Sequence, residues 1–154
     1  METHPALGID YGTARIGIAA TDDCGILAHP VESIDVTRTD PIARIVQLAT
    51  QLRIRTLVLG LPLLLDGTEG GACIKVRTFG TELQAALPEL PLVYVDEFLT
   101  TAEAQEKLHA AGRHARKFKA VIDQAAAVEI LNRWMGDVTT IPGFVIDFNE
   151  RIRT

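Results

Sequence analysis

Residues 6–21 constrain the fold more than any other stretch of this sequence. Two apolar runs, ALGI and IGIAA, are separated by a short polar segment that contains Gly12. Runs of small and β-branched residues predict buried strands, and a tight connection with a glycine predicts that the two strands pair as an antiparallel hairpin. The chain therefore begins a β-sheet, with strands predicted over residues 6–10 and 15–21.

The elements that follow alternate between strands and helices. A third strand is predicted over residues 27–34, and Asp40-Pro41 then predicts the start of a helix, with an N-cap followed by proline at the first helical position. The continuous apolar run at 56–61 is typical of a central strand covered on both faces, and residues 92–97 predict another buried strand. We therefore expect an α/β fold with a mixed five-stranded sheet, in which strands 1–3 are antiparallel, the later strands are parallel, and helices cover both faces.

Three further helices are predicted after the fourth strand. The first spans about residues 72–86, and the last spans about residues 119–135. Between them, Thr100 and Glu103 form a capping box for a helix that ends at Gly112.

Composition and length indicate one folded domain. The chain has 154 residues, of which 47% are hydrophobic, enough for a substantial core. We expect this domain to span residues 1–136, followed by a C-terminal tail, 137–154, that is either a short strand or disordered. The two cysteines are far apart, the N-terminus lacks the layout of an export signal, and the longest apolar run is too short for a bilayer. A cytoplasmic protein with no membrane partner is therefore expected.

Positive charge is concentrated in one segment of an otherwise acidic chain. The net charge is −5, yet residues 107–119, the basic segment, hold five of the 15 lysines and arginines and no acid. Three of these five stand close together: Arg116, Lys117 and Lys119. The segment is either a solvated helix end or a local surface that faces phosphates.

Three carboxylates stand at positions where a buried element would not place an unpaired acid. Asp10 ends the first strand and Glu97 ends the strand LVYVDE. Asp123 shares the apolar stripe of the last helix with Ile130 and Trp134, whereas a solvated helix would put its acid on the other face.

Each acid also has an ordinary interpretation: a turn cap, an exposed loop residue, or a charge near a helix N-terminus. Taken together they favour a site, because ligands bind where parallel strands end. Three acids that converge there repel one another unless a cation holds them. Carboxylate oxygens are the ligands of Mg²⁺ or Mn²⁺ rather than of zinc, so Asp10 is most simply a metal ligand.

Several motifs in order along residues 7–135 resemble those of the YqgF family. They are GIDYGTARIGIA, the loop GLPLLLDGTEG followed by KVRTFGTEL, then VDEFLTTAEA and RKFKAVIDQAAAVEIL. Members of that family are known as Holliday junction resolvases and as pre-16S ribosomal RNA nucleases. The resemblance implies a ribonuclease H-like fold and implies that the three acids are catalytic and bind the metal.

The same resemblance suggests which residues contact nucleic acid. Arg15 matches the arginine of the first motif, and Thr100 and Thr101 match a threonine pair after the glutamate. Family members usually carry arginine directly after that glutamate, where this chain has Phe98, so a phosphate-contacting cation is missing there or is supplied elsewhere. Arg77, on the predicted helix over 72–86, is either a solvated cation or a further phosphate contact.

The sequence thus favours a metal-dependent nuclease that acts on structured RNA or branched DNA. Arg15, Arg116, Lys117 and Lys119 would position the backbone of the nucleic acid. We prefer processing of the 5′ end of precursor 16S ribosomal RNA, with ribosomal precursor particles as partners, to Holliday junction resolution. A resolvase needs a two-fold dimer to cut two strands symmetrically, whereas precursor processing needs no symmetry. Two alternatives from other classes are a sugar-kinase-like ATPase, suggested by GIDYGT, and a non-catalytic nucleic-acid-binding or transcription-associated factor.

Overall fold

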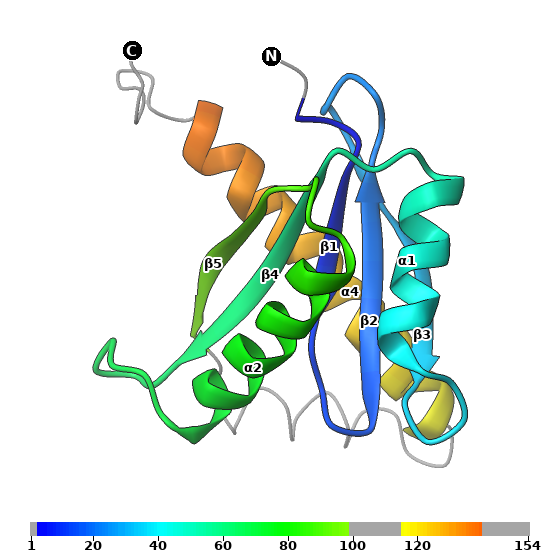
Figure 1. Cartoon of the computed structure of the whole chain (residues 1–154). Helices are drawn as coiled ribbons and strands as arrows, with labels where there is room; N and C mark the ends of the chain where they lie inside the picture. Colours follow the sequence, from blue (N-terminus) through cyan, green and yellow to red (C-terminus); the bar gives the residue numbers. More distant parts are fainter. Residues whose placement is uncertain (1–2, 99–114, 140–154) are drawn as a thin grey trace.

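The computed structural model describes residues 3–98 and 115–139 of the chain (Figure 1). The described residues form five strands and three helices. In chain order they are β1 (Ala6–Asp10), β2 (Arg15–Thr21), β3 (Ala28–Asp35), α1 (Pro41–Gln51), β4 (Thr56–Leu63), α2 (Gly71–Ala86), β5 (Leu92–Phe98) and α4 (Ala115–Thr139).

The strands form one mixed sheet in the order β3-β2-β1-β4-β5. β1 pairs antiparallel with β2 and β2 with β3, whereas β4 runs parallel to both β1 and β5. The predicted mixed sheet with an antiparallel first half is therefore confirmed. Because β1, β4 and β5 are parallel, their carboxyl ends lie at one edge of the sheet, at the bottom of Figure 1.

Helices cover both faces of the sheet, as predicted. α1 and α2 lie in front of it in Figure 1, and α4 crosses behind it. Side chains alternate between the faces along each strand. In β1, for example, Leu7 and Ile9 pack in the core on the α1 and α2 side, and Ala6 packs in the core on the α4 side.

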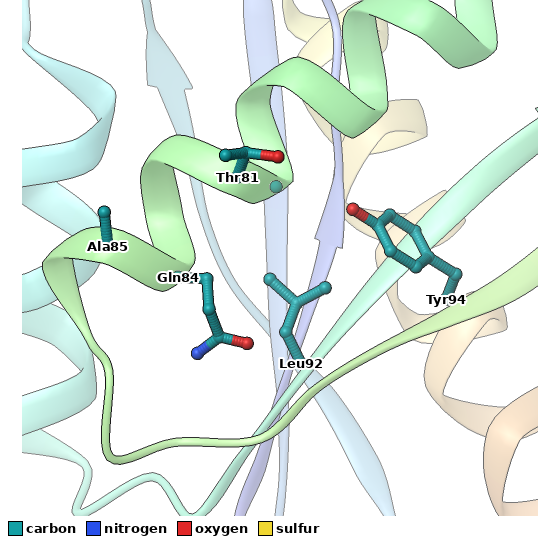
Figure 2. A pocket seen from close by; sticks show the side chains of 6 residues that line it. Thr81, Gln84, Ala85, Leu92 and Tyr94 are labelled. Atoms are coloured by element: carbon teal, nitrogen blue, oxygen red, sulfur yellow. The ribbon is translucent and has the colours of Figure 1, made fainter.

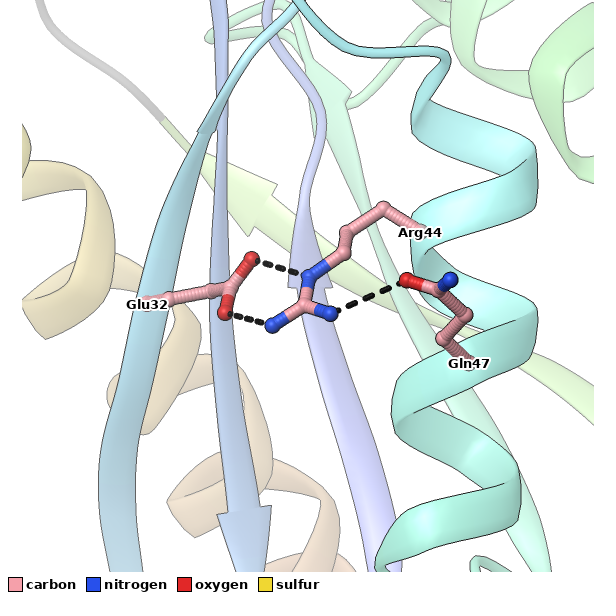
Figure 3. A network of polar contacts seen from close by, with 3 residues as sticks. All are labelled: Glu32, Arg44 and Gln47. Atoms are coloured by element: carbon pink, nitrogen blue, oxygen red, sulfur yellow. Dashed lines mark hydrogen bonds and ion pairs between the residues drawn. The ribbon is translucent and has the colours of Figure 1, made fainter.

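Helix α1 begins where its sequence predicts. The Asp40 carboxylate accepts hydrogen bonds from the backbone N–H groups of Ile42 and Ala43, at 3.1 and 3.5 Å, and Pro41 is the first helical residue. The helix is tied to the edge strand β3 by a two-pronged ion pair (Figure 3). Arg44 Nε and Nη2 donate to the two carboxylate oxygens of Glu32, at 2.9 and 2.7 Å.

Two glycines let α4 lie unusually close to the sheet. A Cβ atom at Gly17 of β2 would overlap the backbone of Asp123 in α4. A Cβ at Gly60 of β4 would lie 2.5 Å from Ile130 Cδ1 and 3.1 Å from Glu97 Oε1. Any larger side chain at these two positions would push the helix away from the carboxyl ends of the strands.

Helix α4 is longer than predicted. It spans Ala115–Thr139 rather than about 119–135. The basic residues before position 119 are already helical, and the helix continues past Gly136. One internal glycine costs a helix only about 1 kcal/mol relative to alanine. The helix predicted between Thr100 and Gly112 lies outside the described residues. Among the helices that are described, none combines the length and the apolar character needed to cross a membrane.

Candidate active site

The three predicted acids come from three different elements and face one another on the α4 side of the sheet. Asp10 is the last residue of β1, and its partner across the hairpin is Gly17. Glu97 lies at the end of β5, in register with Pro62 of β4. Asp123 is in α4, and its backbone is packed on Gly17. The strand ends and the helix crossing therefore bring together residues that are up to 113 positions apart.

Asp10 is the most perturbed of the three acids. Burial, followed by the charges of Glu97 and Asp123, raises the pKa of Asp10 from 3.8 to about 8. Removal from water and nearby negative charge both favour the protonated form of a carboxyl group. At the end of β1 burial is the larger of the two effects, and the two acids add to it.

Glu97 lies in a similar environment, partly compensated by an arginine. Burial raises its pKa, the guanidinium of Arg133 opposes that rise, and Glu129 adds to it. Arg133 Nη1 also donates a hydrogen bond of 2.9 Å to the backbone carbonyl of Asp96. The repulsion between the two strand-end carboxylates raises the pKa of Asp10 and not that of Glu97. Once Asp10 is protonated, it no longer presents a negative charge to Glu97.

Asp123 has a cation of its own. Arg15 Nε donates a hydrogen bond of 2.9 Å to Asp123 Oδ2, and both side chains are mostly enclosed, with 30% and 21% of their surfaces exposed. In the arrangement adopted by the described residues, no three His, Cys, Asp or Glu side chains are grouped as they would be around a metal ion. The acids are thus neighbours, but the one on the helix is held by an arginine.

The other residues that the sequence singled out are distributed differently. Arg77 of α2 forms a bidentate ion pair with Glu69, at 2.8 and 2.6 Å, and its guanidinium lies 5.0 Å from the ring centre of Tyr94. It is therefore not brought together with the three acids, and its contact with nucleic acid stays a prediction. Thr100 and Thr101 lie outside the described residues. Three predicted cations, which we call the α4 cations, lie in the first turns of α4, and their side chains are not among those described: Arg116, Lys117 and Lys119.

A separate pocket lies between the second half of α2 and β5 (Figure 2). It has a volume of about 370 Å³, and the side chains of Gln84, Leu92 and Tyr94 line it. Leu92 and Tyr94 pack with the core on the α1 and α2 side. The pocket is thus on the face of the sheet opposite the acids and is not part of the candidate site.

Sequence reasoning missed two residues that shape the site. Gly60 occupies the strand between Asp10 and Glu97, and its lack of a Cβ lets Ile130 and Glu97 Oε1 approach the strand. Its signal was a glycine inside an otherwise apolar run, which often marks a close approach in a strand. Arg133, the cation near Glu97, had no such signal, because an arginine late in an amphipathic helix is ordinarily solvated.

Comparison with known proteins supports one family. Residues 4–137 match the sequence model of a family described as "RuvX: Holliday junction resolvase". Curated relatives carry the name "Putative pre-16S rRNA nuclease". The relative from Cutibacterium acnes is 45% identical to this chain over 132 residues, which cover 86% of this chain and 82% of the relative. In Kineococcus radiotolerans the identity is 39% over 145 residues, 91% of this chain and 77% of the relative. In a Synechococcus strain it is 39% over 140 residues, 89% of this chain and 92% of the relative.

One solved structure supports the fold. It is described as "T. thermophilus RuvC in complex with Holliday junction substrate", and it superposes with a TM-score of 0.52. The match covers 85% of this chain and 92% of that one, at 16% sequence identity. The ribonuclease H-like fold expected from the sequence is therefore confirmed.

Proposed function

The chain belongs to the RuvX family, which confirms the resemblance to YqgF proteins, and from that membership we propose that it is a metal-dependent nuclease that hydrolyses a phosphodiester bond. As its substrate we propose the 5′ extension of precursor 16S ribosomal RNA, as the names of its curated relatives indicate. The reaction would take place in the cytoplasm, on free precursor or on ribosomal precursor particles. The nuclease domain would comprise residues 1–136, with 137–154 as a tail.

The observation that carries this proposal is that three acids from β1, β5 and α4 lie close enough to influence one another at the carboxyl edge of the sheet. Asp10 has a raised pKa because it is enclosed beside Glu97 and Asp123. Such a group of carboxylates fits a hard divalent cation, Mg²⁺ or Mn²⁺, which would remove the repulsion and ionise Asp10. The chemistry that such an ion supplies when bound is activation of a water nucleophile and stabilisation of the leaving oxygen.

The chain's own residues would share the remaining work. Asp10 and Glu97 would hold the cation from the ends of β1 and β5. Asp123 would complete the ligand set from the helix. Arg15 would contact a substrate phosphate, because a guanidinium suits bidentate contact with phosphate oxygens. Thr100, Thr101 and the α4 cations would position the nucleic acid backbone, and Phe98 would leave one phosphate contact to other residues.

Holliday junction resolution is the second candidate, and the description of the family favours it. It needs two copies of the site related by a two-fold axis, whereas precursor processing needs one. A comparison of cleavage of a four-way DNA junction with cleavage of a precursor that carries the 5′ extension separates the two functions. Neither the ATPase nor the non-catalytic alternative is favoured by the family or by the names of the relatives.

The experiment uses the purified full chain with Mg²⁺ or Mn²⁺. Wild type should cleave the precursor, and chelation should stop the reaction. Asp10→Asn, Glu97→Gln and Asp123→Asn should each lower cleavage by at least about 100-fold, and a double variant should lose little more, because the acids act as a unit. Asp23→Asn, an exposed acid in the turn between β2 and β3, is the control.

The contrary outcomes are distinct. Cleavage of the junction but not of the precursor would assign the chain to resolution. Binding of RNA that is equally tight with the metal chelated, with no cleavage of either substrate, would support the non-catalytic alternative. An acid whose replacement leaves cleavage intact is not part of the site.

A further inference from the structure

Helix α4 links two opposite sides of the candidate site. It crosses behind the sheet from β2 to β5 (Figure 1). The backbone of Asp123 lies on Gly17 of β2, and Arg133 Nη1 donates its hydrogen bond of 2.9 Å to the backbone carbonyl of Asp96 in β5. Because β1 and β4 lie between these two strands, the two contacts are three strand spacings apart, about 14 Å. The helix thus places an acid on the β2 side of the site and a cation on the β5 side.

The guanidinium of Arg133 is oriented beside Glu97. One N–H is anchored on the residue that precedes this glutamate, which leaves most of the N–H donors of an arginine for other partners. Burial raises the pKa of Glu97 and the charge of Arg133 lowers it, so the two groups lie close together. Glu129 stands one helical turn before Arg133, at the spacing of a helical ion pair, yet no ion pair joins the two in the part of the chain that the structure describes. The cation is thus directed toward the site and not toward its own helix.

Arg133 is also accessible to a ligand. Its side chain is exposed, and β5 is the last strand in the order of the described sheet. A cavity of about 330 Å³ lies beside it, lined by Tyr94, Val95, Asp96 and Arg133. Side chains alternate along a strand, so the Asp96 carboxylate points to the face opposite that of Glu97. The guanidiniums of Arg44 and Arg77 are each held by both oxygens of a glutamate. Arg133, by contrast, presents N–H donors that no described carboxylate occupies.

We propose that Arg133 binds a phosphate of the nucleic acid next to the bond that is cleaved, and so positions the strand on the β5 side of the three acids. This inference rests on the proposed function, in which Arg15 contacts a phosphate on the β2 side. Two guanidiniums on opposite sides of the acids hold the strand at two points, which fixes its direction across the site. Arg133 binds a phosphate other than the reacting one, so it is a positioning residue.

The first test measures binding of a single-stranded RNA oligonucleotide to the full chain, in chelator, over a range of salt concentrations. Arg133→Gln should flatten the slope of log affinity against log salt by about 0.7, which is one phosphate contact on a single strand. Arg133→Lys should keep the slope of wild type, because it keeps the charge. Arg53→Gln, which removes the same charge from an exposed turn between α1 and β4, is the matched control and should change nothing.

The second test is cleavage of the precursor with Mn²⁺. Arg133→Gln should raise KM by at least about fivefold, the cost of one hydrogen bond to a charged group, and should leave kcat within about twofold of wild type. This division is expected because a contact with a non-reacting phosphate stabilises substrate and transition state equally. Arg133→Lys should restore most of the KM of wild type.

Modified substrates identify the phosphate. Each carries one uncharged methylphosphonate linkage, at successive positions on either side of the bond that is cleaved. One of these linkages should raise KM for wild type and for Arg53→Gln but not for Arg133→Gln, because that variant has already lost the contact. A series in which every linkage affects wild type and Arg133→Gln equally would contradict the proposal.

The remaining outcomes separate this inference from the proposed function. Arg133 could instead serve only to tie α4 to β5, in which case Arg133→Gln would unfold at a lower urea concentration than wild type and keep its salt slope. That result, or a slope that falls equally in Arg53→Gln, would overturn the phosphate contact while the nuclease function stands. If wild type cleaves neither the precursor nor a four-way junction, the proposed function fails. A slope that still falls only in Arg133→Gln would then support the phosphate contact alone.

Discussion

Replacement of Asp10 by asparagine tests the central electrostatic claim without any substrate. In the folded protein the pKa of Asp10 is raised from 3.8 to about 8, so the folded chain keeps a proton that the unfolded chain loses. Unfolding free energy should therefore fall as the pH rises from about 4 to about 8, and the cost should be fully present above about pH 8. Asparagine resembles the protonated acid in shape and carries no charge, so Asp10→Asn should lack this fall.

The size of the effect follows from the same shift. About four pKa units at about 1.4 kcal/mol per unit set an upper bound of about 6 kcal/mol. Because Asp10 is partly exposed and water screens its neighbours, we expect Asp10→Asn to be more stable than wild type by about 2–3 kcal/mol at high pH. Near pH 4 the two proteins should be equally stable.

The assay is urea unfolding in chelator at several pH values between about 4 and about 8.5, with linear extrapolation to water. Asp23→Asn, an exposed acid, serves as the control and should follow wild type throughout. Added Mn²⁺ should remove the advantage of the variant, because the metal stabilises only the protein that keeps Asp10. A variant that is no more stable than wild type at high pH, or whose advantage is the same at pH 4, would refute the reasoning.

Three further predictions concern the surroundings of the acids. Gly60→Ala should lower the free energy of unfolding by about 1–3 kcal/mol, because its Cβ would press on α4. It should also weaken Mn²⁺ binding in calorimetry, because the same Cβ would lie 3.1 Å from Oε1 of Glu97. Gly71→Ala, where a Cβ would meet nothing within 4 Å, is the control and should do neither. Phe98→Arg, which restores the arginine usual in YqgF proteins, should tighten RNA binding in a filter or fluorescence assay when this position faces the substrate. A variant that is instead destabilised by about a few kcal/mol would place Phe98 in the core, and one that changes neither binding nor stability would contradict both interpretations. Replacing the α4 cations with alanine should weaken RNA binding and flatten its salt dependence by roughly one unit per lost contact, and an unchanged slope would mark them as a solvated surface.

Most of the fold could be predicted because its signals are local. β1 and β2 begin and end at the predicted residues, since apolar runs and a glycine-containing turn act within a few positions. The start of α1 was equally clear, because Asp40-Pro41 places an N-cap acceptor and a fixed φ angle at adjacent positions. The limits of α4 were wrong by about four residues at each end. No N-cap residue precedes Ala115, and Gly136 suggested an earlier end than Thr139, which lies three residues before Pro142.

The candidate site could be predicted only in part, because its geometry is set by contacts distant in sequence. Asp10 and Glu97 stood out as acids at strand ends, and the parallel pairing of their strands through β4 brings those ends to one edge. The partner of Asp123 gave no comparable signal. Arg15 and Asp123 are separated by 108 positions, and each has an ordinary role available within its own element.

Gly17 explains physically why those distant residues meet. The hairpin places Gly17 directly across from Asp10, and the absence of a Cβ lets the backbone of Asp123 occupy the space above it. Gly17, which has no functional side chain, therefore allows Asp123 of the helix to lie beside Asp10 of the strand. Arg15, two positions earlier on the same face, reaches Asp123 for the same reason. A side chain at Gly17 would thus separate Asp123 from both Asp10 and Arg15. A glycine at the position opposite Asp10 is therefore needed for the third carboxylate to reach the site.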